Sequence, residues 1–340
     1  MKHGANIYKY AKRIECKPED LIDFSSNINL YQPELELTIS SKEVAQYPDS
    51  EYKEFRGFLA QKYAIKKSQI ALFSGATAAI YELFASLKRK NVFLYAPLYG
   101  EYEKAALATK KNIYKINRIE DETQAPLEDS IVVFVNPSTP EGTYHKNIKE
   151  LMETWMEHEC TIILDESFLE FEELESMRQE ITSYKRLYII QSFSKFYSCA
   201  GVRVGAIFSN KKNIQKLSIP LWNLSQLDIN FLTLRLSGES FANKSREVHK
   251  THKQELTNIL TESKLFTEIV ESDTNFILTH ASDGEELWEK LLEQKILVRK
   301  CASFDYLNNN WLRFAVKDKE AHKALKKALN TILDDKLNLI

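Results

Sequence analysis

Between residues 70 and 208, short apolar runs alternate with longer stretches whose apolar positions recur with the period of a helix. The apolar runs are IALF at 70, VFLYA at 92, IVVFV at 131, TIILD at 161, YII at 188 and VGAIF at 204. The helical stretches are ATAAIYELFASLKRK at 76, YEKAALATKK at 102 and IKELMETWMEHE at 148. Strands and helices that take turns in this way build a mostly parallel sheet with helices on both faces. The pattern therefore predicts a large α/β domain.

Beyond residue 230 the pattern changes and predicts a smaller α+β domain. It begins with a long charged helix over 241–262. The elements predicted after it are strands at 267–271, 275–279, 296–299 and 311–316, with helices at 283–294 and 319–333. We expect an N-terminal arm over 1–35, a large domain over 36–230 and a small C-terminal domain over 231–340.

Polar residues follow each predicted strand of the large domain. After IALF comes SGAT, in which Gly75 opens a helix whose first amides and Thr77 hydroxyl suit a phosphate. The other strand ends carry Pro97, Tyr99 and Tyr102, the segment NPSTPEG, Asp165, and finally Ser192, Ser194, Lys195 and Arg203. Because ligands collect at the carboxyl ends of strands in open α/β sheets, we expect these groups to converge on one edge.

The charge balance disfavours two classes of partner. With 46 basic and 48 acidic residues, the formal net charge is −2, so no overall field attracts nucleic acid or an anionic membrane. The N-terminus has no apolar signal core and no apolar run reaches the length of a membrane span, so we expect a soluble cytoplasmic protein. The four cysteines lack CxxC spacing, and we predict reduced thiols, ordinary histidines and no metal site.

Glycine is scarce, with nine residues where average usage would give about 24. Five of them, Gly4, Gly75, Gly142, Gly201 and Gly205, fall in the stretches that carry the candidate chemistry. We expect these to stand where the backbone cannot accept a Cβ atom.

The groups at the strand ends suit one cofactor. Asp165 ends an apolar strand, where burying a lone carboxylate is costly, so it should pair with a cation such as a protonated pyridine nitrogen. Tyr99 suits stacking on the ring, and Lys195 suits a Schiff base with an aldehyde. With the phosphate cradle, this set describes pyridoxal 5′-phosphate.

The stretch SFSKFYSCAGVRVG at 192–205 resembles the lysine loop of fold-type I pyridoxal-phosphate enzymes, the aspartate aminotransferase superfamily. The order SGAT, Pro-x-Tyr, NPSTPEG, LDES, SFSK is similar to that family throughout. The closer resemblance is to the branch of L-threonine-O-3-phosphate decarboxylase and histidinol-phosphate aminotransferase. It rests on HGANIY at 3, DFSSNIN at 23, YPDSEY at 47 and VRKCASF at 298.

On the cofactor side, the resemblance implies that Lys195 is the Schiff-base lysine, Asp165 the partner of the pyridine nitrogen and Tyr99 the stacking residue. It also implies a set of residues around the cofactor phosphate: Ala76, Thr77, Ser192, Ser194 and Arg203. Tyr47 would reach the phosphate of the neighbouring subunit's cofactor, which implies a homodimer.

On the substrate side, the resemblance implies that Arg313, in WLRFAV, grips the α-carboxylate in a bidentate fork. His3, Asn27 and Arg299 match positions that would bind the substrate's own phosphate.

The sequence departs from the family at three positions. Thr139 stands where the family has an asparagine that hydrogen-bonds the 3′-oxygen of the cofactor, and Phe168 stands where aminotransferases have a tyrosine that assists the same oxygen. Leu30 replaces a proline. The first two changes concern the tuning of the cofactor rather than its binding.

Residue types leave the reaction open, because the bond that breaks at the substrate α-carbon is the one held perpendicular to the ring. The segments HGANIY and RKCASF favour decarboxylation of an O-phosphorylated hydroxy-amino acid, threonine phosphate or serine phosphate. The alternatives are a histidinol-phosphate-type aminotransferase and, from another class, a protein that binds the cofactor as a sensor or structural element.

Overall fold

The computed structural model describes residues 6–338, which divide by their contacts into two compact units. The large unit comprises Gln32–Ser138 and His145–Asn243. The small unit comprises the chain up to Tyr31, the short segment Thr139–Tyr144, and the chain from Lys244 onward. The domain bounds expected from sequence remain a prediction, and His3, which is expected to bind the substrate phosphate, lies outside the described residues.

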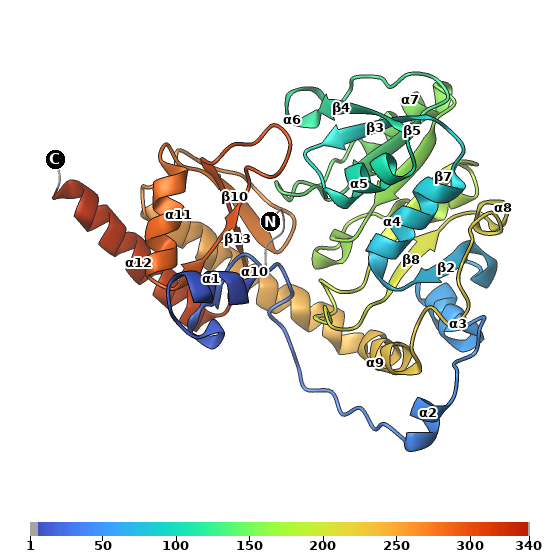
Figure 1. Ribbon diagram of the computed structural model, residues 1–340, viewed down its shortest axis with the longest axis horizontal. Helices are drawn as coiled ribbons and strands as arrows, with labels where there is room; N and C mark the ends of the chain where they lie inside the picture. The colour runs from blue at the N-terminus through green and yellow to red at the C-terminus, as the bar shows by residue number, and fades with distance from the viewer. Residues whose placement is uncertain (1–5, 339–340) are drawn as a thin grey trace. The chain divides into compact units, whose positions relative to one another are not determined.

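The large unit is built on a seven-stranded sheet in the order β2-β8-β7-β6-β5-β3-β4 (Figure 1). Its strands are β2 (Ile70–Phe73), β3 (Asn91–Ala96), β4 (Asn112–Asn117), β5 (Ile131–Val135), β6 (Thr161–Asp165), β7 (Leu187–Ser192) and β8 (Gly205–Phe208). Only β8 runs antiparallel to its neighbours β2 and β7. The other pairs are parallel. The predicted mostly parallel sheet is confirmed.

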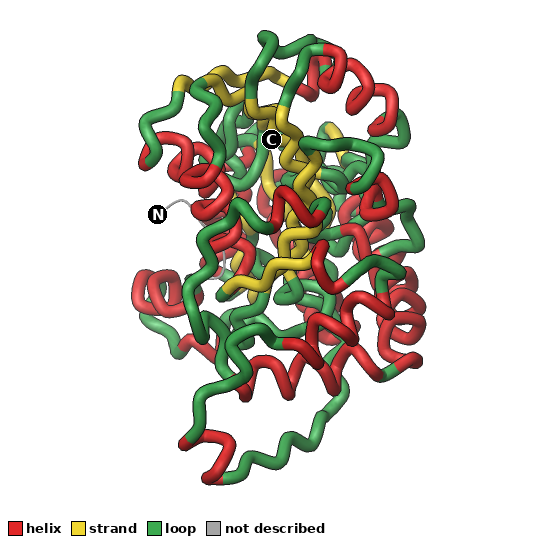
Figure 2. Tube along the Cα trace, turned by 90° about the vertical axis from the view of Figure 1, so that its right-hand side faces the viewer, coloured by secondary structure: helices red, strands yellow, loops and turns green. Residues whose placement is uncertain are grey.

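Helices cover both faces of this sheet. Those of the large unit are α2 (Ser41–Ala45), α3 (Lys53–Lys62), α4 (Gly75–Ser86), α5 (Glu101–Ala108), α6 (Arg118–Asp121), α7 (Ile148–Glu157), α8 (Lys211–Ile214) and α9 (Gln226–Ser237). Figure 1 shows α4 and α5 in front of the strands, where they share an apolar core with Val133 and Val135 of β5. Phe134, between those valines, points to the other face and contacts Trp155 of α7. In Figure 2 the segment leading to α2 is an extended loop.

The small unit contains two sheets. The four-stranded antiparallel sheet has the order β12-β13-β10-β9, and β1 pairs with β11 in parallel. The helix α10 (Glu239–Glu262) begins in the large unit and belongs to the small unit from Lys244 onward. The other elements of the small unit are α1 (Ile7–Arg13), β1 (Ile22–Asp23), β9 (Glu268–Ile269), β10 (Phe276–His280), α11 (Gly284–Glu293), β11 (Ile296–Leu297), β12 (Arg299–Lys300), β13 (Trp311–Ala315) and α12 (Lys319–Leu337). Its core joins apolar residues of α10, α11 and α12 to β10 and β13.

The structure contains elements that were not predicted, among them α3, α9 and β1, and two further differences concern strand pairing. The strand predicted over 296–299 is two strands, since β11 pairs with β1 while β12 pairs with β13. The edge strand β4 was not predicted, because its burial alternates and half of it is polar. Within residues 6–338, no helix is both long and apolar enough to cross a membrane.

Candidate active site

The carboxyl ends of five strands meet at one edge of the large sheet. Strands β3, β5, β6 and β7 are parallel, and β2 has the same direction because β8 is antiparallel to both β2 and β7. The predicted cofactor residues of the large unit that follow these strands therefore arrive at a common edge, as expected from their order in the sequence.

Asp165, the last residue of β6, is 6% exposed and accepts two hydrogen bonds. The backbone N–H of Ser167 donates to its Oδ1 at 2.9 Å, and the hydroxyl of Tyr102 donates to its Oδ2 at 2.7 Å. These donors stabilise a buried carboxylate. A carboxylate has about four lone-pair positions, so it can still accept the N–H of a cationic ring.

Tyr102 was named from the sequence only as an aromatic residue near the site, and its hydrogen bond to Asp165 was not foreseen. Its side chain is fully buried in α5. Burial first, and then the negative charge of Asp165, raises the pKa of Tyr102 well above its usual value. The phenol therefore keeps its proton at neutral pH and acts as the donor.

The N-terminus of α4 is shaped by close backbone approach. Gly75 has φ +80°, and a Cβ atom there would lie 2.7 Å from Nη2 of Arg203. A Cβ atom on Gly205 would lie 2.4 Å from the backbone nitrogen of Ala76. Gly201 differs from the expectation, because a Cβ atom there would meet nothing within 4 Å. The helix amides are thus brought against the lysine loop, forming a cradle suited to a phosphate.

The hydroxyls of the lysine loop belong to a short hydrogen-bonded chain. The N–H of Ser192 donates to Oγ of Ser167 at 3.0 Å, and the N–H of Ser194 lies 3.4 Å from Oγ of Ser192. Arg203 donates from Nη1 to Oγ of Ser194 at 3.3 Å. Nη1 of Arg203 also donates to the carbonyl of Ala200 at 3.0 Å, and Arg203 as a whole is an exposed residue, so an anion can reach its side chain.

Lys195 is half-buried among aromatic residues. Its Nζ lies 5.8 Å from the centroid of the Phe168 ring. Phe171 stacks on Phe168 and meets Phe196 edge-on, so an aromatic cluster supports the loop next to the lysine. Tyr99 lies at the same strand edge, with its hydroxyl 3.5 Å from that of Thr77.

Tyr47 differs from the residues described above because it is largely exposed, with 77% of its surface accessible to solvent. Its ring stacks on that of Trp222 with centroids 4.4 Å apart. Trp222 has φ +54°, an uncommon conformation for a bulky residue. The expected role of Tyr47 toward a neighbouring subunit stays a prediction.

In the small unit, two buried arginines lie side by side. Arg299 and Arg313 are directly opposite in the pairing of β12 with β13, and they are 9% and 7% exposed. The guanidinium of Arg313 stacks on Phe276 at 4.5 Å, and that of Arg299 on Phe304 at 5.4 Å. Burial first, with Arg299 nearby, lowers the pKa of Arg313 to about 10, so it stays charged at neutral pH.

Thr139 belongs to the small unit and is 6% exposed. Its Oγ1 accepts a hydrogen bond from Nη1 of Arg313 at 3.1 Å. The structure thus places this hydroxyl on the arginine, whereas its expected place in the cofactor site remains a prediction.

Asn27 lies in an arm segment that is tied to the rest of the small unit. Its carbonyl accepts from Nδ2 of Asn275 at 2.7 Å, and the carbonyl of Ser26 accepts from Nζ of Lys317 at 2.9 Å. The N–H of Ala315 donates to the carbonyl of Phe24. These bonds hold the arm against the ends of β10 and β13.

A histidine cluster in the small unit was missed from the sequence, although HKQE at 252 has a spacing that metal sites also use. Nδ1 of His252 and Nδ1 of His322 lie 3.3 and 3.0 Å from the same Oε2 of Glu255. Nε2 of His322 accepts the N–H of Lys317, so its proton sits on Nδ1. Metal-bound histidines instead donate their second ring N–H. This arrangement favours a structural hydrogen-bonded cluster.

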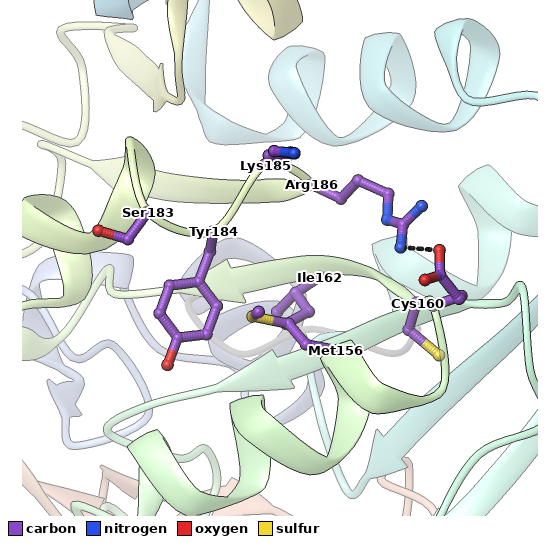
Figure 3. A pocket seen from close by; sticks show the side chains of 8 residues that line it. Met156, Cys160, Ile162, Ser183, Tyr184, Lys185 and Arg186 are labelled. Atoms are coloured by element: carbon purple, nitrogen blue, oxygen red, sulfur yellow. Dashed lines mark hydrogen bonds and ion pairs between the residues drawn. The ribbon is translucent and has the colours of Figure 1, made fainter.

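A pocket of about 360 Å³ lies at the opposite edge of the large sheet, beside the amino ends of β6 and β7. Figure 3 shows Met156, Ile162 and Tyr184 along it, with Arg186 paired to Glu159 at its rim. It lies away from Asp165 and Lys195, which are at the carboxyl ends, and it is not the candidate site.

The two arrangements suit different ligand groups. The large unit offers a helix N-terminus, hydroxyls and Arg203 for a phosphate, a buried carboxylate for a cationic ring nitrogen, and an amine for an aldehyde. The small unit offers two buried guanidinium groups, which suit carboxylate and phosphate groups.

The sequence matches the family described as aminotransferase class I and II over residues 6–329. It is 28% identical over 355 aligned residues to the adenosylcobalamin biosynthesis bifunctional protein CobDQ of Leptospira interrogans, covering 97% of this chain but only 41% of that protein. It is 23% identical to the threonine-phosphate decarboxylase of Salmonella typhimurium, covering 97% of this chain and 96% of that one. Among solved structures, the histidinol-phosphate aminotransferase from Clostridium acetobutylicum is similar with a TM-score of 0.80 and 26% identity, covering 93% and 100%. The expected fold class and the resemblance are thereby confirmed.

Proposed function

Because this chain belongs to the class I and II aminotransferase family, we propose that it decarboxylates an O-phosphorylated hydroxy-amino acid. The proposed substrates are L-threonine O-3-phosphate and L-serine O-phosphate, and the product is the amino-alcohol phosphate. We further propose a homodimer located in the cytoplasm and a role of the kind found in cobamide biosynthesis.

The cofactor is pyridoxal 5′-phosphate, and we propose that it binds at the carboxyl edge of the large sheet. Asp165 is buried and accepts hydrogen bonds from Tyr102 and Ser167, which suits a carboxylate that would also accept the N–H of the cofactor ring. When bound, the cofactor draws into its ring the electron pair of a bond at the substrate α-carbon. We propose that Lys195 carries it covalently, and that Ala76, Thr77, Ser192, Ser194 and Arg203 hold its phosphate.

The observation that carries the substrate proposal is the pair Arg299 and Arg313. Their Cα atoms are partners in one strand pair and both guanidinium groups are buried. Two buried cations of like charge repel each other, so a ligand with two anionic groups would offset their cost. A phosphorylated amino acid has such groups, an α-carboxylate and a phosphate. We propose that Arg313 binds the first and Arg299 the second, with Asn27 and His3 as further phosphate contacts.

The chain's own groups then perform two tasks. Arg313, held by Thr139 and stacked on Phe276, fixes the plane of the carboxylate. Carbon dioxide leaves without its bonding electron pair, and Lys195 would deliver to the α-carbon the proton that replaces the carboxylate. A hydrophobic support around Lys195, including Phe168, limits the access of water.

A histidinol-phosphate-type aminotransferase is the second candidate, favoured by the similarity to the Clostridium acetobutylicum structure. Histidinol phosphate has a phosphate but no carboxylate, so in that reaction an arginine such as Arg313 would serve the amino-acid or keto-acid partner. There Lys195 would move a proton away from the α-carbon rather than deliver one after loss of carbon dioxide.

Product analysis separates these candidates. The cofactor-loaded protein is incubated with O-phospho-L-threonine and O-phospho-L-serine, with and without 2-oxoglutarate, and the products are identified by mass spectrometry. We expect the amine phosphate and carbon dioxide without the keto acid. Glutamate formed only with 2-oxoglutarate present would reject decarboxylation in favour of amino-group transfer. A change in the absorbance of the bound cofactor without any product would favour the sensor alternative. Lys195→Ala serves as the inactive control.

A further inference from the structure

We propose that Tyr102 is a positioning residue that holds the Asp165 carboxylate in one rotation, ready to accept the N–H of the cofactor's ring nitrogen. The inference rests on the cofactor, which the family membership supplies, and not on which reaction follows. It assigns a role to a residue of α5 that lies 63 positions before its partner in the sequence.

A carboxylate at the position of Asp165 needs strong donors. With 6% of its surface exposed, it has lost most of its hydration, and an ionised group so buried is costly unless it is hydrogen-bonded. The Ser167 amide satisfies Oδ1, and the Tyr102 hydroxyl satisfies Oδ2. At 2.7 Å, the second contact has the length of a charge-assisted O–H···O⁻ bond.

The orientation of the carboxylate follows from having one fixed donor on each oxygen. Ser167 follows Asp165 closely in the chain, so its amide alone constrains the group only from one side. Tyr102 comes from helix α5, and its ring is fully buried in the apolar core that α4, α5 and β5 share. Because a fully buried ring is held in place by its packing, its hydroxyl constrains the rotation of the carboxylate about the Cβ–Cγ bond.

A single turn of the chain links Tyr102, which contacts Asp165, to Tyr99, the residue proposed to stack on the cofactor ring. The N–H of Tyr102 donates to the carbonyl of Tyr99 at 3.1 Å, so the two tyrosines of PLYGEY lie in the same turn. Tyr99 is half-buried at the strand edge, whereas Tyr102 points into the core. The segment therefore sets the plane in which a ring stacks and the direction from which its nitrogen is bound.

The test removes one oxygen atom. In Tyr102→Phe we expect the dissociation constant for pyridoxal 5′-phosphate to rise ~10-fold or more, the size of a lost hydrogen bond to a charged group. The pH midpoint at which the visible absorbance of the bound cofactor changes should also rise. A poorly aligned carboxylate stabilises the protonated form of the ring nitrogen less well, so the ring is less positive. Such a ring withdraws less electron density from the Lys195 nitrogen, which then keeps its proton to higher pH.

Tyr95→Phe is the matched control. Tyr95 is equally buried in the large unit, and its hydroxyl donates to the Gln124 carbonyl and accepts from Nε1 of Trp155 at 2.8 Å. Loss of the Tyr95 hydroxyl should lower thermal stability but leave the affinity for the cofactor and the pH profile of its absorbance unchanged. If Tyr102→Phe behaves in the same way as this control, Tyr102 is only structural and the proposal is wrong.

A double-mutant cycle tests whether Tyr102 acts through Asp165. In an Asp165→Asn background, adding Tyr102→Phe should change cofactor affinity less than ~2-fold, since the charge that Tyr102 orients is already gone. Equal losses in both backgrounds would overturn the proposal. Neither measurement depends on carbon dioxide release, so the inference can fail while the proposed reaction stands, and the reverse.

Discussion

The carboxyl edge of the large sheet and the arginine pair of the small unit are built in opposite ways. At the sheet edge, the buried carboxylate of Asp165 is stabilised by neutral donors, and the cations Lys195 and Arg203 stand on a loop. In the small unit, two cations are buried together against aromatic rings. The buried charge of Asp165 has hydrogen-bond donors without any ligand, whereas we propose that an anionic ligand offsets the repulsion between the two buried arginines. The difference predicts that the two sites respond separately to substitution.

The largest separate effect is expected at Arg313. In Arg313→Lys the charge remains but the planar fork is lost, so kcat/KM should fall about 10²- to 10³-fold, the cost of disrupting a buried hydrogen-bonded charge pair. Cofactor affinity should stay within about twofold of the parent value, because no cofactor contact is removed. Steady-state kinetics and a cofactor titration measure the two quantities.

Arg186→Lys is the control for this substitution, since Arg186 forms an exposed ion pair with Glu159. It should change neither quantity. A parallel loss of cofactor affinity in Arg313→Lys would show that the two sites are not separate and would break the comparison.

The next largest effect is expected for a substitution of Gly205, which should weaken binding of the cofactor. A Cβ atom in Gly205→Ala would push against the Ala76 nitrogen at 2.4 Å and the Gly75 carbonyl carbon at 2.6 Å, so the start of α4 must shift. We expect cofactor affinity to fall ~10-fold and the free energy of unfolding to fall by about 1–3 kcal/mol. Fluorescence titration and denaturant unfolding report these changes.

Gly201→Ala separates this steric effect from a general effect of alanine in the same loop, since its Cβ atom would meet nothing within 4 Å. It should bind the cofactor as the parent protein does. If Gly201→Ala weakens binding as strongly as Gly205→Ala, flexibility of the loop rather than contact with α4 is responsible.

The smallest expected effect is a loss of stability of the small unit at acidic pH. Burial lowers the pKa of His249 to about 4 from 6.5, while its Nε2 contacts the Thr274 carbonyl. The unfolded chain therefore binds a proton more readily between these pH values, so stability is full above pH 6.5 and is lost as pH falls toward 4. At pH 5 the loss should be about 2 kcal/mol.

Hydrogen exchange at pH 7.5 and 5.0, compared at matched intrinsic rates, localises this loss. Peptides of α10 and β10 should lose protection at the lower pH before those of β6 and β7 do. His249→Gln keeps an N–H donor without the titration, so its small unit should be less sensitive to pH. The prediction fails if the large sheet loses protection first.

Much of the large unit could be predicted from sequence because its signals are local. Each buried strand is a continuous apolar run and each covering helix shows its own periodicity, so the strands β2, β3, β5, β6, β7 and β8 were predicted close to their observed bounds. In the edge strand β4, three of the six residues are polar and a fourth, Tyr114, is exposed, so its weak apolar pattern went unrecognised. The strand predicted over 296–299 was divided by partners distant in the chain.

The sequence by itself determined the alternation of strands and helices and the chemistry at the strand ends, because periodicity and short motifs are properties of neighbouring residues. It also pointed to the lysine loop and thus to the cofactor. Only the tertiary structure decided that Tyr102 donates to Asp165, that Gly205 meets the start of α4, and that Arg299 lies opposite Arg313. These contacts depend on strand register and on the packing of layers, and each joins residues whose own surroundings in the sequence contain no sign of the partner.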